Sequence, residues 1–324
     1  MKFLTDINIR SLQPPITYTD KLLLTGSCFT EHIGNHLMDA KFNVLQNPNG
    51  ILFDPLSVCR SLVSYIHNTQ YTKDDLFYLN ESWHSWQHHS RFSNPDGDEC
   101  LKHINASQTA AHHFIKEAEW LIITLGSSFS YKLADNAVHV ANCHKAPAQQ
   151  FIKHLCSIEE TVTALDGTIH QLFHFNKKLN IIFTISPVRH LRDGVVENNR
   201  SKARLIEAVH HLVNKFDRLH YFPAYELVID VLRDYRFYDI DLAHPNYAAT
   251  QFVLEKFSEN CLNDAAKKLA EEIKKITIAA NHKAFNPQSQ QHKQFLQTHL
   301  ERTKHLQQLY PFLDFSKELQ YFEK

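Results

Sequence analysis

Five short runs of apolar and β-branched residues recur along the chain, and longer segments with helical periodicity separate them. The runs are continuously apolar rather than alternating, which is typical of strands buried on both faces of a parallel sheet. Between Leu205 and Phe216, by contrast, apolar residues recur three and four positions apart, which predicts a helix. The chain is therefore expected to be an α/β three-layer sandwich with a five-stranded parallel sheet. The expected strands are residues 21–25, 43–46, 120–125, 179–186 and 219–222.

Two segments depart from this alternation. Residues 81–94 hold two tryptophans, three histidines and an arginine, and we interpret them as an insertion or a hairpin over the sheet edge. From about residue 281 the chain becomes polar, Asn286-Pro287 predicts a helix start, and the apolar residues 310–315 are expected to dock on the body. The pattern predicts a main domain over 1–280, with an insertion around 70–115, and a C-terminal helical appendage over 281–324.

Composition narrows the class of protein. The chain has 324 residues, 43% of them hydrophobic, and a formal net charge of −1, so no overall field favours nucleic acid or an anionic membrane. The six cysteines form no CxxC pair, which is typical of reduced thiols. The first residues lack the apolar core of a signal peptide, and no run is long enough to span a bilayer. We expect a cytoplasmic protein.

Candidate catalytic residues stand at the ends of the predicted elements. Ser27 and Cys28 follow the glycine that ends the first strand, and Asp241 precedes His244 by three residues. Together they supply a nucleophile, a base and an orienting carboxylate. Ligands of a doubly wound sheet bind at the carboxyl ends of the strands, and a helix start there favours a thiolate or an oxyanion. Taken alone, Ser27 fits a helix N-cap and Cys28 a small buried apolar residue.

These motifs resemble a known family. The run Leu-Leu-Leu-Thr-Gly-Ser-Cys-Phe-Thr at 22–30 looks like the first block of the SGNH (GDSL-like) hydrolases, and Asp-Leu-Ala-His-Pro at 241–245 matches their last block, Asp-x-x-His-Pro. The resemblance is closer to the GSCFA-domain family, a bacterial branch of that superfamily, with Gly26-Ser27-Cys28-Phe29-Thr30 as its name-giving motif and threonine where alanine is usual. Further segments similar to that family are residues 47–55, 83–86, 88–93, 142–145, 186–190 and 197–203.

The resemblance implies a flavodoxin-like sandwich of SGNH type and an acyl-ester hydrolase or acyltransferase. Its substrate would be an O-acylated carbohydrate or another small ester, and it would need no metal or organic cofactor. In gapless register Cys28 takes the place of the family's catalytic serine, whereas a shift by one keeps Ser27. We favour Cys28 because its alignment with the catalytic serine requires no gap. His244 would be the general base and Asp241 its orienting partner, with Asp239 as a local competitor.

The oxyanion-binding residues depart from the superfamily pattern. Gly50 could supply the glycine amide of the second block, but the third block, Gly-x-Asn-Asp, reads Gly126-Ser127-Ser128-Phe129 here. Ser128 therefore stands where an asparagine would donate to the oxyanion, with Asn142 as a substitute from elsewhere. Losing one such donor typically costs about a hundredfold or more in rate. The alternative reading is a catalytically idle ligand-binding protein on the same scaffold.

Other polar residues are candidates for binding substrate. We expect His84 and Arg91 beside the pocket, Asn142 and His144 in a pocket segment or a solvated loop, and Arg189 as a clamp for a substrate anion. The competing interpretation of Arg189 is a surface ion pair with Asp193 or Glu197. The histidines at 84, 88 and 89 raise a metal-dependent alternative, but no partner has matching spacing, so we expect no metal site. Trp83 and Trp86 fit core packing better than a sugar platform. The oligomeric state is left open.

Overall fold

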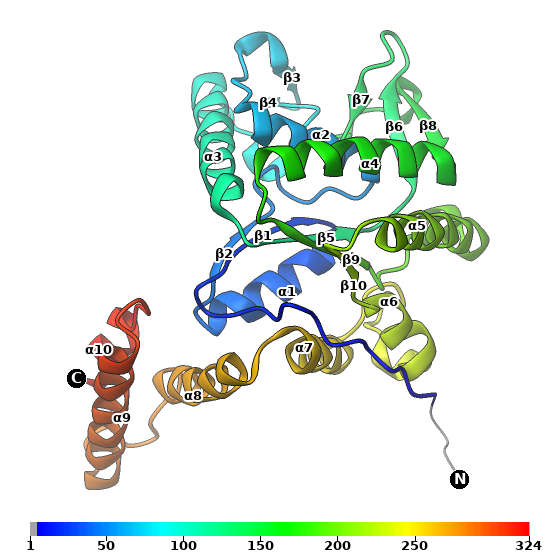
Figure 1. Ribbon diagram of the computed structural model, residues 1–324. Helices are drawn as coiled ribbons and strands as arrows, with labels where there is room; N and C mark the ends of the chain where they lie inside the picture. Colours follow the sequence, from blue (N-terminus) through cyan, green and yellow to red (C-terminus); the bar gives the residue numbers. More distant parts are fainter. Residues whose placement is uncertain (1–4, 324) are drawn as a thin grey trace.

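A five-stranded parallel sheet forms the centre of the molecule (Figure 1). The computed structural model describes residues 5–323. The sheet order is β10-β9-β5-β1-β2, and every neighbouring pair is parallel. All five predicted strands are confirmed, with bounds that differ by at most a residue or two. They are β1 (Lys21–Gly26), β2 (Asn43–Gln46), β5 (Trp120–Leu125), β9 (Asn180–Ile185) and β10 (Leu219–Tyr221).

Helices cover both faces of this sheet, so the three-layer α/β sandwich is confirmed. Successive side chains of β1 point to opposite faces: Leu22 and Leu24 join one buried cluster and Leu23 joins the other. The first cluster is covered by α1 (Cys28–Asp39), α7 (Tyr247–Cys261) and α8 (Asp264–Ala280), with the short α6 (Ala224–Glu226) and the π-helical η5 (Leu227–Leu232). The second is covered by α2 (Pro55–His67), α3 (Gly97–Glu117), α4 (Ile158–Phe175) and α5 (Val195–Lys215).

Two small antiparallel sheets lie outside the central one. A hairpin joins β3 (Phe77–Leu79) to β4 (Ser82–His84); β4 lies in the 81–94 segment expected to be an insertion or hairpin, and β3 lies just before it. Trp86 stacks on Phe77 with ring centroids 3.5 Å apart, so this tryptophan packs within the segment. The other sheet, of order β7-β6-β8, was not predicted. Its strands are β6 (Phe129–Leu133), β7 (His139–Val140) and β8 (Phe151–Leu155). Single 3₁₀ turns are η1 (Lys73–Asp75), η2 (Ser90–Phe92), η3 (Ala148–Gln150), η4 (Leu191–Asp193) and η6 (Tyr235–Phe237).

The C-terminal segment consists of α9 (Gln290–Leu309) and α10 (Ser316–Phe322). The predicted helix start at Asn286-Pro287 is wrong by a few residues, because Ser289 is the N-cap and its hydroxyl accepts from the His292 N–H at 3.2 Å. The apolar stretch near residue 313 packs inward, with Phe315 fully buried. Lys41, which follows α1, donates to the Asp314 carbonyl at 2.7 Å and pairs with Glu318 at 2.9 Å. These contacts join α10 to the body.

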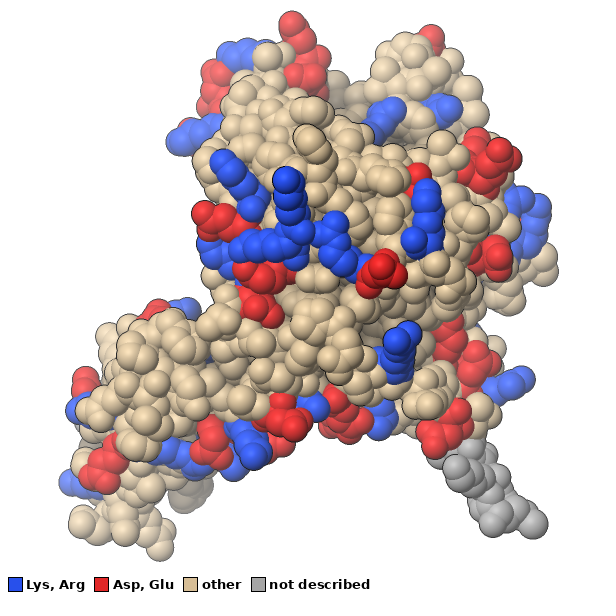
Figure 2. Space-filling view, viewed as in Figure 1, with Lys and Arg blue, Asp and Glu red and all other residues tan. Residues whose placement is uncertain are grey.

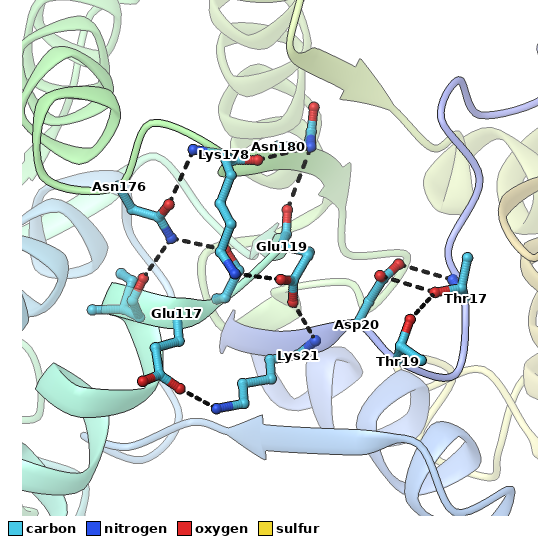
Figure 3. A network of polar contacts seen from close by, with 11 residues as sticks. Thr17, Thr19, Asp20, Lys21, Glu117, Glu119, Asn176, Lys178 and Asn180 are labelled. Atoms are coloured by element: carbon cyan, nitrogen blue, oxygen red, sulfur yellow. Dashed lines mark hydrogen bonds and ion pairs between the residues drawn. The ribbon is translucent and has the colours of Figure 1, made fainter. Parts of the chain in front are cut away.

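A polar network closes the amino ends of the central strands (Figure 3). The Lys21 N–H donates to the Glu119 carboxylate at 2.7 Å, and the Asn180 N–H donates to the Glu119 carbonyl at 2.9 Å. Lys178 pairs with the same carboxylate. Figure 2 shows basic and acidic side chains intermixed on the face of the molecule that it presents. The opposite edge, at the carboxyl ends of the strands, carries the candidate site. No helix within residues 5–323 combines the length and apolarity needed to cross a bilayer.

Candidate active site

The turn from β1 to α1 is built around Gly26. Its φ of +138° lies in a region that side-chain-bearing residues rarely adopt, and a Cβ there would come 2.1 Å from the Thr124 carbonyl oxygen. The Gly26 N–H donates to the Asn47 Oδ1 at 3.0 Å, and the Ser27 N–H donates to the Thr124 carbonyl at 2.9 Å. This close passage across β5 ends the strand and makes Cys28 the first residue of α1.

Ser27 and Cys28 have different surroundings in this turn. Ser27 occupies the N-cap position and is only 1% exposed, yet its hydroxyl neither caps the helix nor finds another partner within residues 5–323. Cys28 is half-buried. Burial raises the pKa of the Cys28 thiol, while Lys202 and the backbone N–H groups of Phe29 and of Cys28 itself act in the opposite direction. The net effect is a raised thiol pKa, in which Lys202 and the first-turn amides offset part of the cost of burial.

His244 and Asp241 form a close pair on one loop. The His244 Nδ1 and the Asp241 Oδ2 are 2.6 Å apart, and the other carboxylate oxygen accepts the N–H groups of Ala243 and His244 at 2.9 and 3.0 Å. These bonds, first the backbone N–H of His244 and then its side chain, lower the pKa of Asp241 to about 2. Asp239 instead uses its backbone N–H to hold the His244 carbonyl at 2.8 Å. Among the candidate carboxylates, Asp241 is the one that contacts the imidazole.

This loop lies at the same edge of the sheet as Cys28. The Arg189 N–H, shortly after β9, donates to the Ala243 carbonyl at 3.0 Å. Desolvation lowers the pKa of His32, one helical turn after Cys28, and the neighbouring charge of His244 lowers it further. Desolvation likewise lowers the pKa of His190 to about 4, with additional contributions from Lys202 and His244. The loop after β9 and the start of α1 thus both adjoin His244.

Lys202 is a component of this edge that sequence reasoning missed. It is 1% exposed, and its Nζ donates to the carbonyls of Gly126 and Ser186, both at 2.6 Å. Burial lowers the pKa of this amine to about 7. A signal was present, because Lys202 stands on the apolar stripe of its helix with Leu205 and Leu212.

The predicted oxyanion donors are engaged in bonds within the chain. The Gly50 N–H donates to the Asn47 carbonyl at 2.7 Å, and the Gly126 N–H donates to the Phe53 carbonyl at 2.8 Å. The Ser128 hydroxyl donates to the Ser201 carbonyl at 3.1 Å. By contrast, the side-chain amide nitrogen of fully buried Asn47 has no hydrogen-bond partner within residues 5–323. An unpaired buried amide is costly unless a ligand or water satisfies it.

The predicted substrate-binding residues lie in several places. His84 is enclosed in the hairpin segment, where its Nδ1 and Nε2 lie 2.6 Å from the Ser93 hydroxyl and 2.9 Å from the Leu79 carbonyl. Arg91 reaches the site itself: it donates to the Asn47 carbonyl and pairs with Glu31 of α1 at 3.4 Å.

Arg189 lies over the ring of Tyr238, with 4.3 Å from its guanidinium carbon to the ring centroid. Asp193 and Glu197, the alternative partners of Arg189, pair with Lys153 and Arg200.

A cavity of about 650 Å³ adjoins this edge and includes Asn142 and His144 among its lining residues. Phe53 belongs both to the cavity lining and to the edge of the sheet. Its carbonyl accepts the Gly126 N–H, and its ring packs edge-on against that of His190 with centroids 5.5 Å apart. The lining combines aromatic rings with cationic groups. It includes Phe53, Phe129, Tyr131, Phe151, Lys153 and Arg192.

Metal-binding candidates occur at two places in the described residues. The nitrogens of His84 are both within hydrogen-bond distance of the protein oxygens named above, and the His88 Nδ1 lies 2.9 Å from the Ser85 hydroxyl. Within residues 5–323, one group has the composition of a metal site: His154, Cys156 and Glu160 have ligand atoms within 4.8 Å of one another. The His154 Nε2 already lies 2.9 Å from a Glu160 carboxylate oxygen there.

The fold and the residues at the carboxyl ends of its strands define an α/β protein with a thiol at the start of the helix that follows the first strand. Comparison with protein families then identifies the family. The GSCFA family model matches residues 21–257, and the model of the GSCFA domain protein C-terminal domain matches residues 273–324. The chain belongs to the GSCFA family. No curated protein sequence shows a significant match.

Among solved structures, two esterases share a distant similarity with this chain. A carbohydrate esterase family 3 protein from Talaromyces cellulolyticus has 8% sequence identity and a TM-score of 0.36, over 79% of this chain and 99% of that chain. An acetyl xylan esterase from the rumen bacterium Butyrivibrio proteoclasticus has 12% identity and a TM-score of 0.37, over 80% of this chain and 65% of that chain. At these values the similarity carries no argument about activity.

Proposed function

We propose that this protein is an acyl-ester hydrolase or acyltransferase that uses Cys28 as nucleophile, His244 as general base and Asp241 as its orienting partner. The observation that carries the proposal is the 2.6 Å contact between the His244 Nδ1 and the Asp241 carboxylate, at the edge of the sheet where Cys28 begins α1. A carboxylate on one imidazole nitrogen holds the ring's tautomer and stabilises the imidazolium that forms during acyl transfer.

Cys28 is preferred to Ser27 because of exposure and helix position. Ser27 is 1% exposed, so a substrate carbonyl would have to displace its neighbours to reach the hydroxyl, whereas Cys28 is half-buried. A thiolate is also favoured by the amides of a first helical turn, and both the Cys28 and Phe29 N–H groups act on this sulfur.

In the proposed reaction, the Cys28 thiol proton passes to the His244 Nε2 as the sulfur bonds to the ester carbonyl carbon. The same proton is then delivered to the departing alcohol oxygen as the tetrahedral intermediate collapses to a thioester. Water or another alcohol then repeats the sequence on the thioester and releases Cys28.

The oxyanion of that intermediate needs donors other than those expected from the sequence. Because the amides of Gly50 and Gly126 are engaged, we propose that the first-turn N–H of Cys28, which would turn from the sulfur to the oxyanion, and the side-chain amide of Asn47 serve instead. Asn47 is supported by its unpaired buried nitrogen and by the bond that joins its Oδ1 to Gly26, next to the nucleophile turn.

For the substrate, we propose an O-acylated carbohydrate or a similar small ester. The cavity of about 650 Å³ beside Phe53 is large enough for a sugar-sized group, and its aromatic rings would offer stacking faces.

The proposal is tested by steady-state hydrolysis of p-nitrophenyl acetate and of acetylated sugars. We expect wild-type turnover that falls at least about a hundredfold in His244→Ala and in Cys28→Ala, because each removes a reacting group. His292→Ala is the matched control, since this histidine lies in α9, outside the candidate site, and should leave turnover unchanged. Turnover that is absent from the wild type, or that persists in His244→Ala, would reject the proposal and favour the ligand-binding alternative.

A further inference from the structure

A buried cation faces the nucleophile turn from the other side of the sheet edge. Lys202 is 1% exposed, and it comes from α5 rather than from any of the motifs that carry the proposed chemistry. Its Nζ lies 2.6 Å from the carbonyls of Gly126 and Ser186, which follow the ends of β5 and β9. A Cβ on Gly126 would in turn be 3.1 Å from the Cβ of Ser27. Lys202 therefore lies directly beside the turn that presents Cys28.

Burying a lysine at this point is unfavourable unless its charge is compensated. A lysine ammonium has three N–H donors. The two carbonyls take two of them, and the third has no hydrogen-bond partner within residues 5–323. Carbonyl dipoles alone are weak compensation for a full charge in a site closed to water. The lowered pKa of Lys202 reduces this cost by favouring the neutral amine, and a thiolate on Cys28 would supply the counter-charge that the ammonium lacks.

The remaining titratable groups around the pair do not provide that anion. The pKa of His190 is lowered to about 4 by burial and then by Lys202, so its ring is neutral near pH 7. Burial raises the pKa of Tyr225, whose ring centroid is 5.9 Å from the Lys202 Nζ, so its hydroxyl is neutral as well. Glu31 on α1 carries a negative charge but is paired with Arg91. Cys28 is thus the group whose ionisation would balance Lys202.

We propose that Lys202 is a positioning residue whose buried ammonium is the counter-charge of the Cys28 thiolate. It acts through Cys28: the proton still leaves the thiol for His244, and the Lys202 ammonium, which a pKa of about 7 keeps protonated below neutral pH, stabilises the sulfur anion. The inference rests on the proposed function insofar as Cys28 is the nucleophile. It also explains why a cysteine can replace the serine usual in this register, since a hydroxyl would not ionise beside this cation and a thiol can.

The test measures the thiolate directly rather than catalysis. The rate of Cys28 carboxamidomethylation by iodoacetamide is followed by peptide mass spectrometry between pH 5.5 and 9.5 in the wild type, Lys202→Met and Lys202→Arg. Cys143, which is also half-buried, is the internal reference in every sample. We expect Lys202→Met to slow Cys28 labelling at pH 6.5, where the pKa of about 7 leaves Lys202 protonated, at least about tenfold relative to Cys143, which equals one unit of thiol pKa. Lys202→Arg keeps the charge and should retain labelling within about threefold.

Folded Lys202→Met with unchanged Cys28 labelling would overturn the inference. If the Lys202 variants do not fold, Cys28→Ser decides, because it changes one atom. The carbon-13 chemical shift of the Lys202 Cε is followed against pH in wild type and Cys28→Ser. The pH midpoint of this titration should fall when the thiolate is removed, and an unchanged midpoint would also overturn the inference. Labelling that depends on Lys202 in a protein without ester turnover would reject the proposed function and keep this inference. Ester turnover with Cys28 labelling that does not depend on Lys202 would keep the proposed function and reject this inference.

Discussion

Replacing Gly26 by alanine should strongly destabilise the protein. The new Cβ would lie 2.1 Å from the Thr124 carbonyl oxygen and 2.8 Å from its carbon, so β1 and β5 would have to separate in the middle of the sheet. The φ of +138° adds backbone strain of about 1–3 kcal/mol, and overpacking against a buried strand adds about 1–3 kcal/mol more. We expect a loss of about 2–6 kcal/mol in the free energy of unfolding, measured by urea denaturation followed by circular dichroism.

Gly167→Ala is the matched control for this prediction. Gly167 lies within α4, is exposed, and has no atom within 4 Å of the position its Cβ would take. Alanine is favoured over glycine inside a helix by about 0.5–1 kcal/mol, so this variant should be slightly more stable than the wild type. A Gly26→Ala protein within about 1 kcal/mol of the wild type would refute the reasoning, because the turn would then tolerate a side chain.

Three further predictions concern charged groups. Asp241→Asn should lower ester turnover by about a hundredfold or more. The free energy of unfolding should change by less than about 1 kcal/mol, because the Asp241 side chain is exposed. Turnover equal to that of the wild type would show that the carboxylate does not orient His244. Asp54→Ala should cost about 1–3 kcal/mol in urea denaturation, because this buried N-cap accepts the N–H groups of Leu56 and Ser57 and the Ser57 hydroxyl. Burial lowers the folded pKa of Lys202 to about 7, so the folded state binds fewer protons than the unfolded state above that pH. Stability should therefore rise from pH 7 towards 10, at most about 1.4 kcal/mol per pH unit. This rise should be missing in Lys202→Met.

The central sheet was predictable because its strands are apolar on both faces. Each of β1, β5 and β9 is a continuous apolar run, and a run of that kind has few alternatives to a strand covered by helices on both sides. The sheet of β6, β7 and β8 was not predictable by the same rule. Its strand β8 reads Phe-Ile-Lys-His-Leu and is largely exposed, and β7 has two residues. Such strands depend on cross-strand partners that are distant in sequence.

In the candidate site, too, the features that depend on neighbouring residues were predictable, and those that depend on residues distant in the sequence were not. The position of Cys28 at a helix start follows from residues next to it, because Gly26 ends the strand there. Whether a glycine amide is free to bind an oxyanion depends on which carbonyl approaches it. For Gly126 that carbonyl belongs to Phe53, far away in the sequence, and spacing could not reveal it. Lys202 is similar, since its burial depends on carbonyls that two strands bring to it.

The most direct test of the central claim is the intact mass of the protein after brief exposure to p-nitrophenyl acetate. Wild type, Ser27→Ala, Cys28→Ala and His244→Ala would be compared, and the modified peptide sequenced. The account predicts one acetyl adduct on Cys28 in wild type and Ser27→Ala, and none on that peptide in Cys28→Ala or His244→Ala. An adduct that is lost in Ser27→Ala but kept in Cys28→Ala would contradict the account and make Ser27 the nucleophile.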